Sequence, residues 1–328
     1  MSLKHRLVEI LEDGGDNYIS GSSLASGLSV SRSAVWKAVE ALRAEGCDIS
    51  AVTNRGYRLE SSGDALSASG IERCLATKSV FAVDVRKTVP STNTALRELA
   101  AKGTPEGYVI AAEGQTAGKG RLGREFHSPA GHGVYFSLLL RPVGGLNVGA
   151  TLVTPAAAVA AARAIESVLG IRVGIKWVND LFLGDKKVCG ILTEATFHME
   201  SGTVESAVLG IGLNITKPEG GYPDAIRHIA APLTQAWPGR ENRRCRLIAS
   251  TLDNFWAFYR DLSGRAFLDE YRERSIVLGR RIYVLSTGEP RPAEAIEIDD
   301  ECRLVVRYDN GDVARLGSGE VSIRLDGK

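Results

Sequence analysis

The residues best suited to chemistry lie in one glycine-rich and cation-rich stretch, GQTAGKGRLGR, over residues 114–124. It follows an apolar segment, residues 108–112, that reads as a strand. Glycines let the backbone approach a ligand closely, and neighbouring cations supply charge for an anion. The glycines are Gly114, Gly118, Gly120 and Gly123, and the cations are Lys119, Arg121 and Arg124. This combination predicts an anion-binding loop at the end of a strand.

Two well-known phosphate motifs do not fit this loop. The spacing of Gly118, Gly120 and Gly123 spells GxGxxG, but that motif opens a helix, whereas residues 128–131 read SPAG and continue none. No suitable acid follows it either. The phosphate loop of nucleotide hydrolases fails because Gly114 and Gly118 are one residue too close. A flexible surface loop without a ligand remains the alternative.

Two later segments carry charges inside apolar runs. Lys176, Asn179 and Asp180 interrupt VGIKWVNDLFL, which reads as one strand, and Lys187 and Glu194 flank the apolar part of KKVCGILTEATF. Buried charges need partners or a ligand. A salt-bridged strand end would explain either segment alone. Together with the glycine-rich loop, they favour one site that handles phosphate and a metal-bound nucleotide.

The N-terminal residues have the pattern of a winged helix-turn-helix. Three helical patterns are followed by a hairpin around residues 54–56, and in the third helix the residues at helical spacing on one face are apolar. The opposite face near its start is polar, where a recognition helix presents base-reading side chains. The predicted DNA contacts are Ser31, Arg32, Ser33, Trp36, Lys37 and, at the hairpin tip, Arg55.

Charge alone does not decide for DNA. Residues 1–62 carry seven Lys/Arg against eight Asp/Glu, so a helical interaction domain with a solvated charged face is a serious alternative. Residues 31–59 carry five cations against three acids. Because DNA affinity depends mainly on phosphate neutralisation, this modest excess predicts weak binding by one copy and a need for a dimer.

The elements that position these residues fall into three predicted domains within 328 residues. They are a winged helix-turn-helix over 1–62, an α/β domain over 64–272 and a small β-barrel over 276–328, with a linker at Ser61, Ser62 and Gly63. The composition, 44% hydrophobic and 24% charged, is that of a folded cytoplasmic protein, and no uninterrupted apolar run is long enough to span a membrane. Five scattered cysteines and five histidines show neither disulfide nor metal spacing, so we expect reduced, mostly buried thiols and no protein-bound metal.

Five ordered motifs resemble those of the biotin protein ligases, and the resemblance spans essentially the whole chain. The motifs are STN at 91–93, GQTAGKGRLGR at 114–124, KWVND at 176–180, KVCGIL at 187–192 and GIGLN at 210–214. The domains in front and behind resemble those of the bacterial bifunctional form. The resemblance implies an α+β multidomain fold, with a catalytic domain related to class II aminoacyl-tRNA synthetases and an SH3-like C-terminal barrel.

The resemblance also implies roles for individual residues. Arg121 and Lys187 would be catalytic. The implied biotin site comprises Ser91, Thr92, Asn93, Gln115, Gly118, Arg121, Lys187 and Gly190. The implied nucleotide site comprises Arg121, Arg124, Lys176, Asn179, Asp180, Asn214 and Arg324.

The implied activity is ATP-dependent and uses Mg²⁺ with the nucleotide. Biotin would become biotinyl-5′-AMP and would then pass to a lysine of the biotin carboxyl carrier protein of acetyl-CoA carboxylase. A homodimer would also bind operator DNA and repress biotin synthesis in response to biotin. The alternatives are a lipoate or octanoate protein ligase, or a ligand-sensing transcription factor without ligase activity.

The sequence departs from the family pattern at four positions. Lys119 and Leu122 stand where arginine is common, Val178 where proline is frequent, and Phe126 where tryptophan is frequent. Loss of a cation at Leu122 is expected to loosen nucleotide binding.

Overall fold

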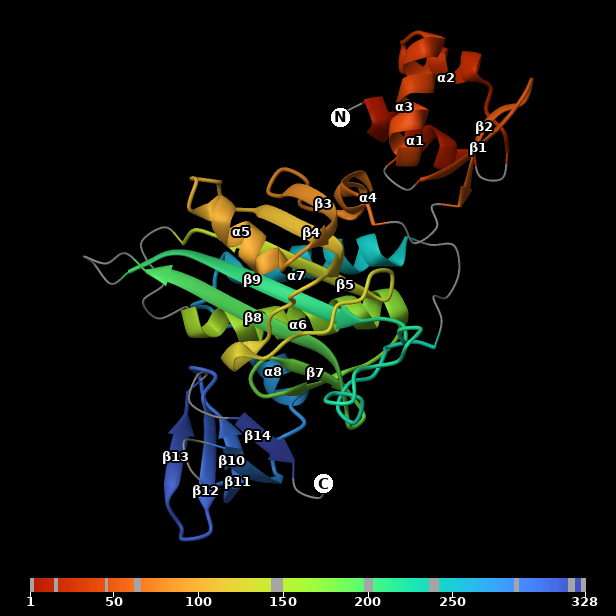
Figure 1. Ribbon diagram of the computed structural model, residues 1–328. Coiled ribbons are helices and arrows are strands. Elements are labelled where there is room, and N and C mark those ends of the chain that lie inside the picture. The colour runs from red at the N-terminus through yellow and green to blue at the C-terminus, as the bar shows by residue number, and fades with distance from the viewer. Residues whose placement is uncertain are drawn as a thin grey trace.

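The computed structural model has an N-terminal helical unit, a central sheet flanked by helices, and a small all-β unit (Figure 1). It describes residues 3–14, 17–44, 47–61, 66–142, 150–197, 203–235, 242–285, 289–317 and 322–325.

The N-terminal unit is the predicted helix-turn-helix followed by a hairpin. Its elements are α1 (Leu3–Asp13), α2 (Gly21–Leu28), α3 (Arg32–Ala44), β1 (Asp48–Val52) and β2 (Gly56–Ser61). The helices share a core that includes Leu7, Leu24 and Val35. Ser31 Oγ accepts a hydrogen bond from Ala34 N at 3.2 Å, a contact typical of the residue that caps the start of a helix.

The predicted linker is wrong at Ser61. Strand β2 runs through Ser61, which pairs with Asp48 of β1, so Ser61 belongs to the hairpin. Ser62 and Gly63 lie outside the described residues.

The central sheet has seven strands in the order β3-β4-β5-β9-β8-β7-β6. Only β3 and β4 pair in parallel, so the sheet is mixed. The strands are β3 (Ala82–Val89), β4 (Tyr108–Gln115), β5 (Gly133–Leu140), β6 (Gly174–Lys176), β7 (Asp180–Leu183), β8 (Lys186–Phe197) and β9 (Val204–Asn214). The helices are α4 (Ala68–Cys74), α5 (Thr92–Ala100), α6 (Ala150–Leu169), α7 (Arg243–Tyr259) and α8 (Leu268–Glu273).

Helices cover both faces of this sheet. Helix α5 packs Leu96 and Ala100 against Ile110, Leu139 and Val208 on one face, whereas α6 and α7 pack on the other (Figure 1). A strand buried on both faces has no polar side to alternate with. This explains why β5 reads as an apolar run interrupted only by Ser137 and is buried at every position.

Helix α6 is apolar almost all round. Within the described part of the chain, it is the one helix long and apolar enough to cross a membrane. However, 67% of that window is buried inside the protein, where the helix packs on the sheet and against α7. Length and composition therefore describe a core helix here.

The segment VGIKWVNDLFL is not one strand, which corrects the sequence prediction. It forms the hairpin β6–β7, in which Lys176 pairs with Asp180 and the chain reverses over residues 177–179. The polar residues that interrupted the apolar run lie at and beside this turn. A turn at a sheet edge accommodates polar groups that the middle of a buried strand would not.

The C-terminal unit contains the predicted short strands. They are β10 (Arg281–Leu285), β11 (Arg291–Ile298), β12 (Leu304–Tyr308), β13 (Val313–Leu316) and β14 (Ser322–Leu325), in the antiparallel order β13-β12-β11-β10-β14. The DNGD sequence turns β12 into β13, with Gly311 at φ 88°. Among the described residues β13 and β14 are the two edges, so the sheet is not seen to close into the predicted barrel.

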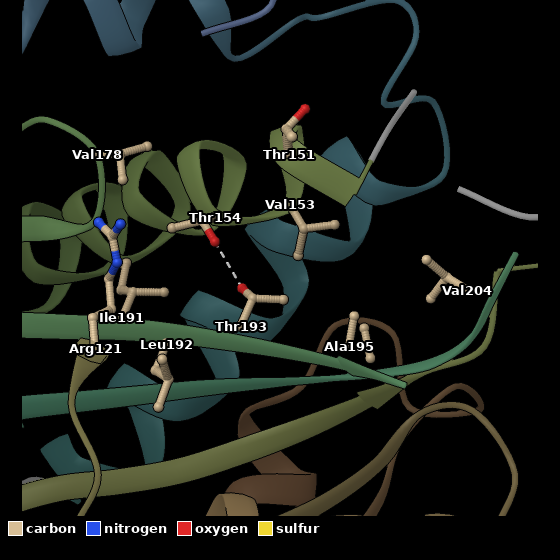
Figure 2. A pocket seen from close by; sticks show the side chains of 11 residues that line it. Arg121, Thr151, Val153, Thr154, Val178, Ile191, Leu192, Thr193, Ala195 and Val204 are labelled. Carbon is tan, nitrogen blue, oxygen red and sulfur yellow. Dashed lines mark hydrogen bonds between the residues drawn. The ribbon is translucent and has the colours of Figure 1, made fainter. Parts of the chain in front are cut away.

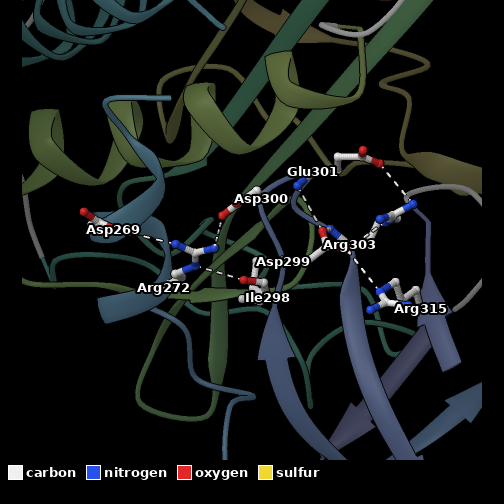
Figure 3. A network of polar contacts seen from close by, with 8 residues as sticks. All are labelled: Asp269, Arg272, Ile298, Asp299, Asp300, Glu301, Arg303 and Arg315. Carbon is white, nitrogen blue, oxygen red and sulfur yellow. Dashed lines mark hydrogen bonds and ion pairs between the residues drawn. The ribbon is translucent and has the colours of Figure 1, made fainter. Parts of the chain in front are cut away.

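Arg272 joins α8 to the turn between β11 and β12 (Figure 3). Its Nε donates to the Ile298 carbonyl at 2.9 Å and its guanidinium to Asp300 at 2.8 Å. Beside it, Trp177 Nε1 donates to the Cys302 carbonyl at 2.8 Å. The β6–β7 turn and the C-terminal unit are thus held in one fixed relation.

We expect Arg272→Met to lower the free energy of unfolding by about 1–3 kcal/mol, because hydrogen bonds to a charged group are lost and the Ile298 carbonyl loses its partner. Urea denaturation followed by tryptophan fluorescence measures this change. The matched control is Arg307→Met, which removes an ion pair to Glu294 with both side chains about half exposed. Its expected cost is below about 0.5 kcal/mol. Equal losses in the two variants would contradict the joining role of Arg272.

Candidate functional site

The first polar cluster forms where α5 begins and β4 ends. Ser91 is the N-cap of α5 and is 2% exposed, and Thr92 follows it. Gln115, the last residue of β4, accepts hydrogen bonds through Oε1 from Thr92 N at 2.8 Å and Thr92 Oγ1 at 3.1 Å. Its Nε2 donates to Ser128 Oγ at 2.8 Å. The amide of Gln115 is therefore fixed in one orientation.

The glycine-rich loop folds back beside this cluster as a short hairpin. Phe126 N donates to the Gly118 carbonyl at 2.8 Å, and Gly120 N donates to the Arg124 carbonyl at 2.7 Å. A Cβ on Gly118 would collide with the Phe126 carbonyl and with Ser128 Oγ. Only glycine lets the two sides of the hairpin approach this closely.

The second cluster contains the predicted charged residues. Arg121 donates to Asn179 Oδ1 at 3.0 Å, and Asn179 Nδ2 donates to Asp180 Oδ1 at 3.0 Å. Lys187 Nζ lies 2.6 Å from the same Asp180 oxygen, with both side chains about one quarter exposed. Two cations and one carboxylate thus converge at a partly buried edge of the sheet.

Burial lowers the pKa of the Arg121 guanidinium from its ordinary value, while nearby Asp180 acts in the opposite direction. Arginine remains charged across the physiological range. A partly desolvated cation attracts an anion more strongly than a solvated one. The second cluster is therefore suited to bind carboxylate or phosphate.

Gly190 marks where the two clusters meet. It pairs with Asp180 of β7 and with Gly212 of β9. A Cβ at this position would lie 3.0 Å from the Phe126 ring and 3.2 Å from Lys187 Nζ. The glycine-rich loop, through Phe126, and the charged edge, through Lys187, therefore border the same patch of backbone.

Four further residues predicted for the nucleotide site are placed as follows. Arg124 is exposed, and Lys176 Nζ lies 5.3 Å from the centroid of the Phe182 ring. Asn214 is buried at the end of β9, next to Leu213, which pairs with Cys189 of β8. Arg324 pairs through its backbone with Tyr283 in the C-terminal sheet, and its side chain lies outside the described residues.

Several residues that complete the site were not assigned to it from the sequence. Ser128 holds Gln115, buried Ser137 contacts Thr92, and Tyr271 donates from α8 to the Val178 carbonyl at 3.0 Å. One signal was available, since Gly210 and Gly212 alternate in β9 and so point to one face. Alternating glycines indicate that something approaches that face closely.

A cavity of roughly 200 Å³ lies between the start of α6 and strands β8 and β9 (Figure 2). Arg121 stands at one end, and a 2.7 Å hydrogen bond joins Thr154 to Thr193 within it. Ile191, Thr193 and Ala195 line it, whereas Gly190 faces the Phe126 ring. Since side chains alternate along a strand, the cavity lies on the other face from the first cluster. It also falls short of the roughly 300–1,000 Å³ of a typical ligand pocket.

The predicted DNA-contacting residues are all exposed. Ser31, Arg32, Ser33, Trp36 and Lys37 are all exposed at the start of α3, with Trp36 at 55%. At the hairpin tip, Arg55 is exposed, and its guanidinium lies 4.6 Å from the centroid of the Tyr18 ring.

The fold and site define a class of protein, one that joins a DNA-binding module to an α/β domain with an anion-handling site. Comparison with known proteins makes this specific. Residues 85–214 match the biotin/lipoate A/B protein ligase family, and residues 4–58 match an HTH domain. The bifunctional ligase/repressor BirA of Bacillus spizizenii is 34% identical over 326 residues, which cover 98% of this chain and 99% of that protein.

Two further relatives agree. The biotin–[acetyl-CoA-carboxylase] ligase of Mycobacterium tuberculosis is 32% identical and covers 73% of this chain and 88% of its own length. The structure of the biotin protein ligase from Aquifex aeolicus in complex with biotin and ATP matches with a TM-score of 0.61 at 26% identity, over 74% of this chain and 99% of that one. This chain belongs to the biotin/lipoate A/B protein ligase family, in the form that carries an N-terminal helix-turn-helix domain.

Cysteine reactivity tests how β8 is turned at the site. Burial raises the pKa of the Cys189 thiol and raises that of Cys302 to about 12. Both thiols therefore stay protonated at pH 8, where the reactive thiolate is scarce. We expect iodoacetamide at pH 8 to label exposed Cys74 in the native protein and to label Cys189 and Cys302 only after unfolding, as read by peptide mass spectrometry. Rapid native labelling of Cys189 would mean that β8 presents the opposite face to the site.

Proposed function

We propose that this protein is a biotin protein ligase and a biotin-responsive transcriptional repressor. It activates biotin with ATP and transfers it to a lysine of the biotin carboxyl carrier protein of acetyl-CoA carboxylase. The observation that carries the proposal is the near-complete match to bifunctional ligase/repressors, combined with the approach of Phe126, which follows the glycine-rich loop, and of Lys187 to the same residue, Gly190. The relatives' names and the bound biotin and ATP in the Aquifex structure support the substrates.

The first cluster is proposed to hold biotin. Ser91, Thr92 and Gln115 offer hydroxyl and amide groups, which suit a neutral ureido ring that both donates and accepts hydrogen bonds. Asn93, Gly118 and Gly190 complete this site. The apolar Phe126 ring on the Gly190 and Gly212 backbone is well placed to cover the ring and its chain.

The second cluster is proposed to hold the reacting groups and the nucleotide. Arg121 and Lys187 are the catalytic cations, and Asn179 and Asp180 organise the nucleotide. Their oxygen atoms are the donors that Mg²⁺ prefers, so they fit an ion that enters with ATP and neutralises phosphate charge. Arg124, Lys176, Asn214 and Arg324 are further proposed nucleotide contacts.

The reaction proceeds in two displacements. The biotin carboxylate attacks the α-phosphate of ATP and forms a mixed anhydride, while pyrophosphate leaves. A neutral lysine amine of the acceptor then attacks the biotinyl carbonyl, AMP leaves, and the amine loses a proton. Neither step needs a protein nucleophile. Positioning and cationic stabilisation by Arg121 and Lys187 supply the catalysis.

The finer architecture is part of the same proposal. The catalytic domain, residues 64–272, is related to class II aminoacyl-tRNA synthetases, and residues 276–328 form an SH3-like barrel behind it. Residues 1–62 form the DNA-binding domain. The protein acts in the cytoplasm as a homodimer, because the weak cation excess of one recognition unit makes a single copy a poor operator binder.

Two alternatives differ in substrate or in class. A lipoate or octanoate protein ligase would share the adenylate chemistry, and a ligand sensor would bind an effector without ligation. Incubation with ATP, an acceptor domain and radiolabelled biotin, lipoate or octanoate separates the three functions. The presence of both Lys187 and Arg121 favours an active enzyme over a sensor.

We expect Lys187→Ala to slow adenylate formation about 100-fold, equal to about 2.7 kcal/mol of transition-state stabilisation, because a cation next to the reacting groups is lost. Pyrophosphate release with biotin and ATP measures this rate. The matched control is the adjacent Lys186→Ala, since Lys186 instead donates to the His228 carbonyl at the surface. Near-normal adenylate synthesis by Lys187→Ala would refute the catalytic assignment.

Repression is expected to depend on the adenylate. If adenylate orders the 114–124 loop at the dimer surface, ligand binding and dimerisation reinforce each other by the same factor. We expect biotin plus ATP to shift titration of a fluorescent operator to roughly 5–150-fold lower protein concentration, and unbiotinylated acceptor to reverse the shift. A protein that begins at Asp64 is the control and should ligate without binding operator. Identical curves with and without biotin plus ATP would contradict the corepressor role.

A further inference from the structure

Glu194 on β8 lies between two surface cations and the buried end of the first cluster. Its Oε1 is 3.3 Å from Arg97 of α5 and 3.8 Å from Lys119 of the glycine-rich loop. Its Oε2 accepts a hydrogen bond from Asn93 Nδ2 at 2.9 Å. The proposed chemistry gives this carboxylate no role.

The contact with Glu194 fixes the orientation of a buried amide. Asn93 is 4% exposed, and its Nδ2 also lies 3.3 Å from the Leu192 carbonyl. Both partners only accept, since one is a carboxylate and the other a carbonyl. The amide nitrogen must therefore face them, and Oδ1 must face the interior. There Oδ1 lies 2.6 Å from Ser137 Oγ.

Ser137 connects Asn93 to Thr92 of the first cluster through its hydroxyl. It is fully buried, and its hydroxyl can reach both Asn93 Oδ1 and Thr92 Oγ1, the latter at 2.7 Å. A hydroxyl has one proton and donates to one acceptor at a time. While Asn93 Oδ1 faces Ser137, the Ser137 hydroxyl can donate its proton to that oxygen. An Asn93 that presented its amide nitrogen would direct the proton to Thr92, the partner of Gln115.

We propose that Glu194 is a positioning residue which, through Asn93 and Ser137, sets the donor and acceptor pattern that the Thr92 hydroxyl presents to the ureido ring beside the fixed amide of Gln115. The inference rests on the proposed biotin site. The space around Asn93 favours such a relay, because a Cβ on Gly210 would collide with its amide and the side chain has little room to move. A buried polar chain is costly if one member is misoriented, so the end that fixes its direction matters.

The test substitution is Glu194→Gln, which keeps the shape but offers both a donor and an acceptor to Asn93. We expect the Kd for biotin, measured by calorimetry, to rise about tenfold, equal to about 1.4 kcal/mol. The preference for biotin over 2-iminobiotin, which carries a nitrogen in place of the ureido oxygen, should fall. The KM for ATP should stay within about twofold, because Arg121, Lys187 and Asp180 have no part in the relay. A general folding defect would instead change both substrates.

Two comparisons sharpen the test. Glu205→Gln removes a carboxylate from the neighbouring strand β9 and should leave the biotin Kd unchanged. Ser137→Ala removes the middle of the relay, so adding Glu194→Gln to it should weaken biotin binding no further, whereas independent roles would add.

The outcomes are distinct. A tenfold effect confined to biotin and absent in the Ser137→Ala background supports the relay. An unchanged biotin Kd in Glu194→Gln, or additive effects in the double variant, would overturn it while the proposed function stands. Failure of the unaltered protein to bind biotin would overturn the proposed function, and the relay with it.

Discussion

Buried polar groups must find partners, and the candidate site depends on how the central sheet meets this constraint. At the edge formed by β7 and β8, the Asp180 carboxylate accepts from Lys187 and Asn179, and Asn179 accepts from Arg121. Each of these side chains is a hydrogen-bond or ion-pair partner of another. The glycine-rich loop, the β6–β7 turn and the start of β8 are therefore held together at one point. A ligand with phosphate or carboxylate oxygens can take the place of Asp180 beside Lys187 and of Asn179 beside Arg121 without leaving either cation buried and unpaired.

The same requirement extends beyond the central sheet. The β6–β7 turn carries Asn179, and its neighbours are tied to elements far along the chain. Trp177 donates to Cys302 in the C-terminal unit, and Tyr271 donates from α8 to the Val178 carbonyl. The C-terminal unit therefore contributes to the geometry of the charged edge without offering a described side chain to it. Mutations at that interface should act on the site through backbone placement.

Glycines lie at the positions of the candidate site where any side chain would collide with a neighbouring group. Gly190 and Gly212 leave the sheet open to the Phe126 ring, and Gly118 lets the loop close on itself. The family's frequent tryptophan is replaced here by the smaller Phe126, and the neighbouring Leu122 is 70% exposed at φ 56°. Leu122 itself brings no cation to this turn, so the positive charge of the loop and of the adjoining strand comes from its neighbours Arg121 and Arg124 and from Lys187.

The sequence by itself determined the local elements and the chemistry they carry. Helical periodicity located α1 to α3, and glycines with cations marked the loop, because these signals act over a few residues. The ordered motifs identified the family. Only the tertiary structure showed which residues far apart in the sequence are in contact. It turned VGIKWVNDLFL into a hairpin, brought Ser128 and Ser137 to residues far away in sequence, and connected Glu194 to Gln115 through three intervening side chains. Such contacts arise from strand register across a mixed sheet, where a shift of one residue moves every side chain to the other face. Register is set by the packing of the whole domain, which no short segment contains.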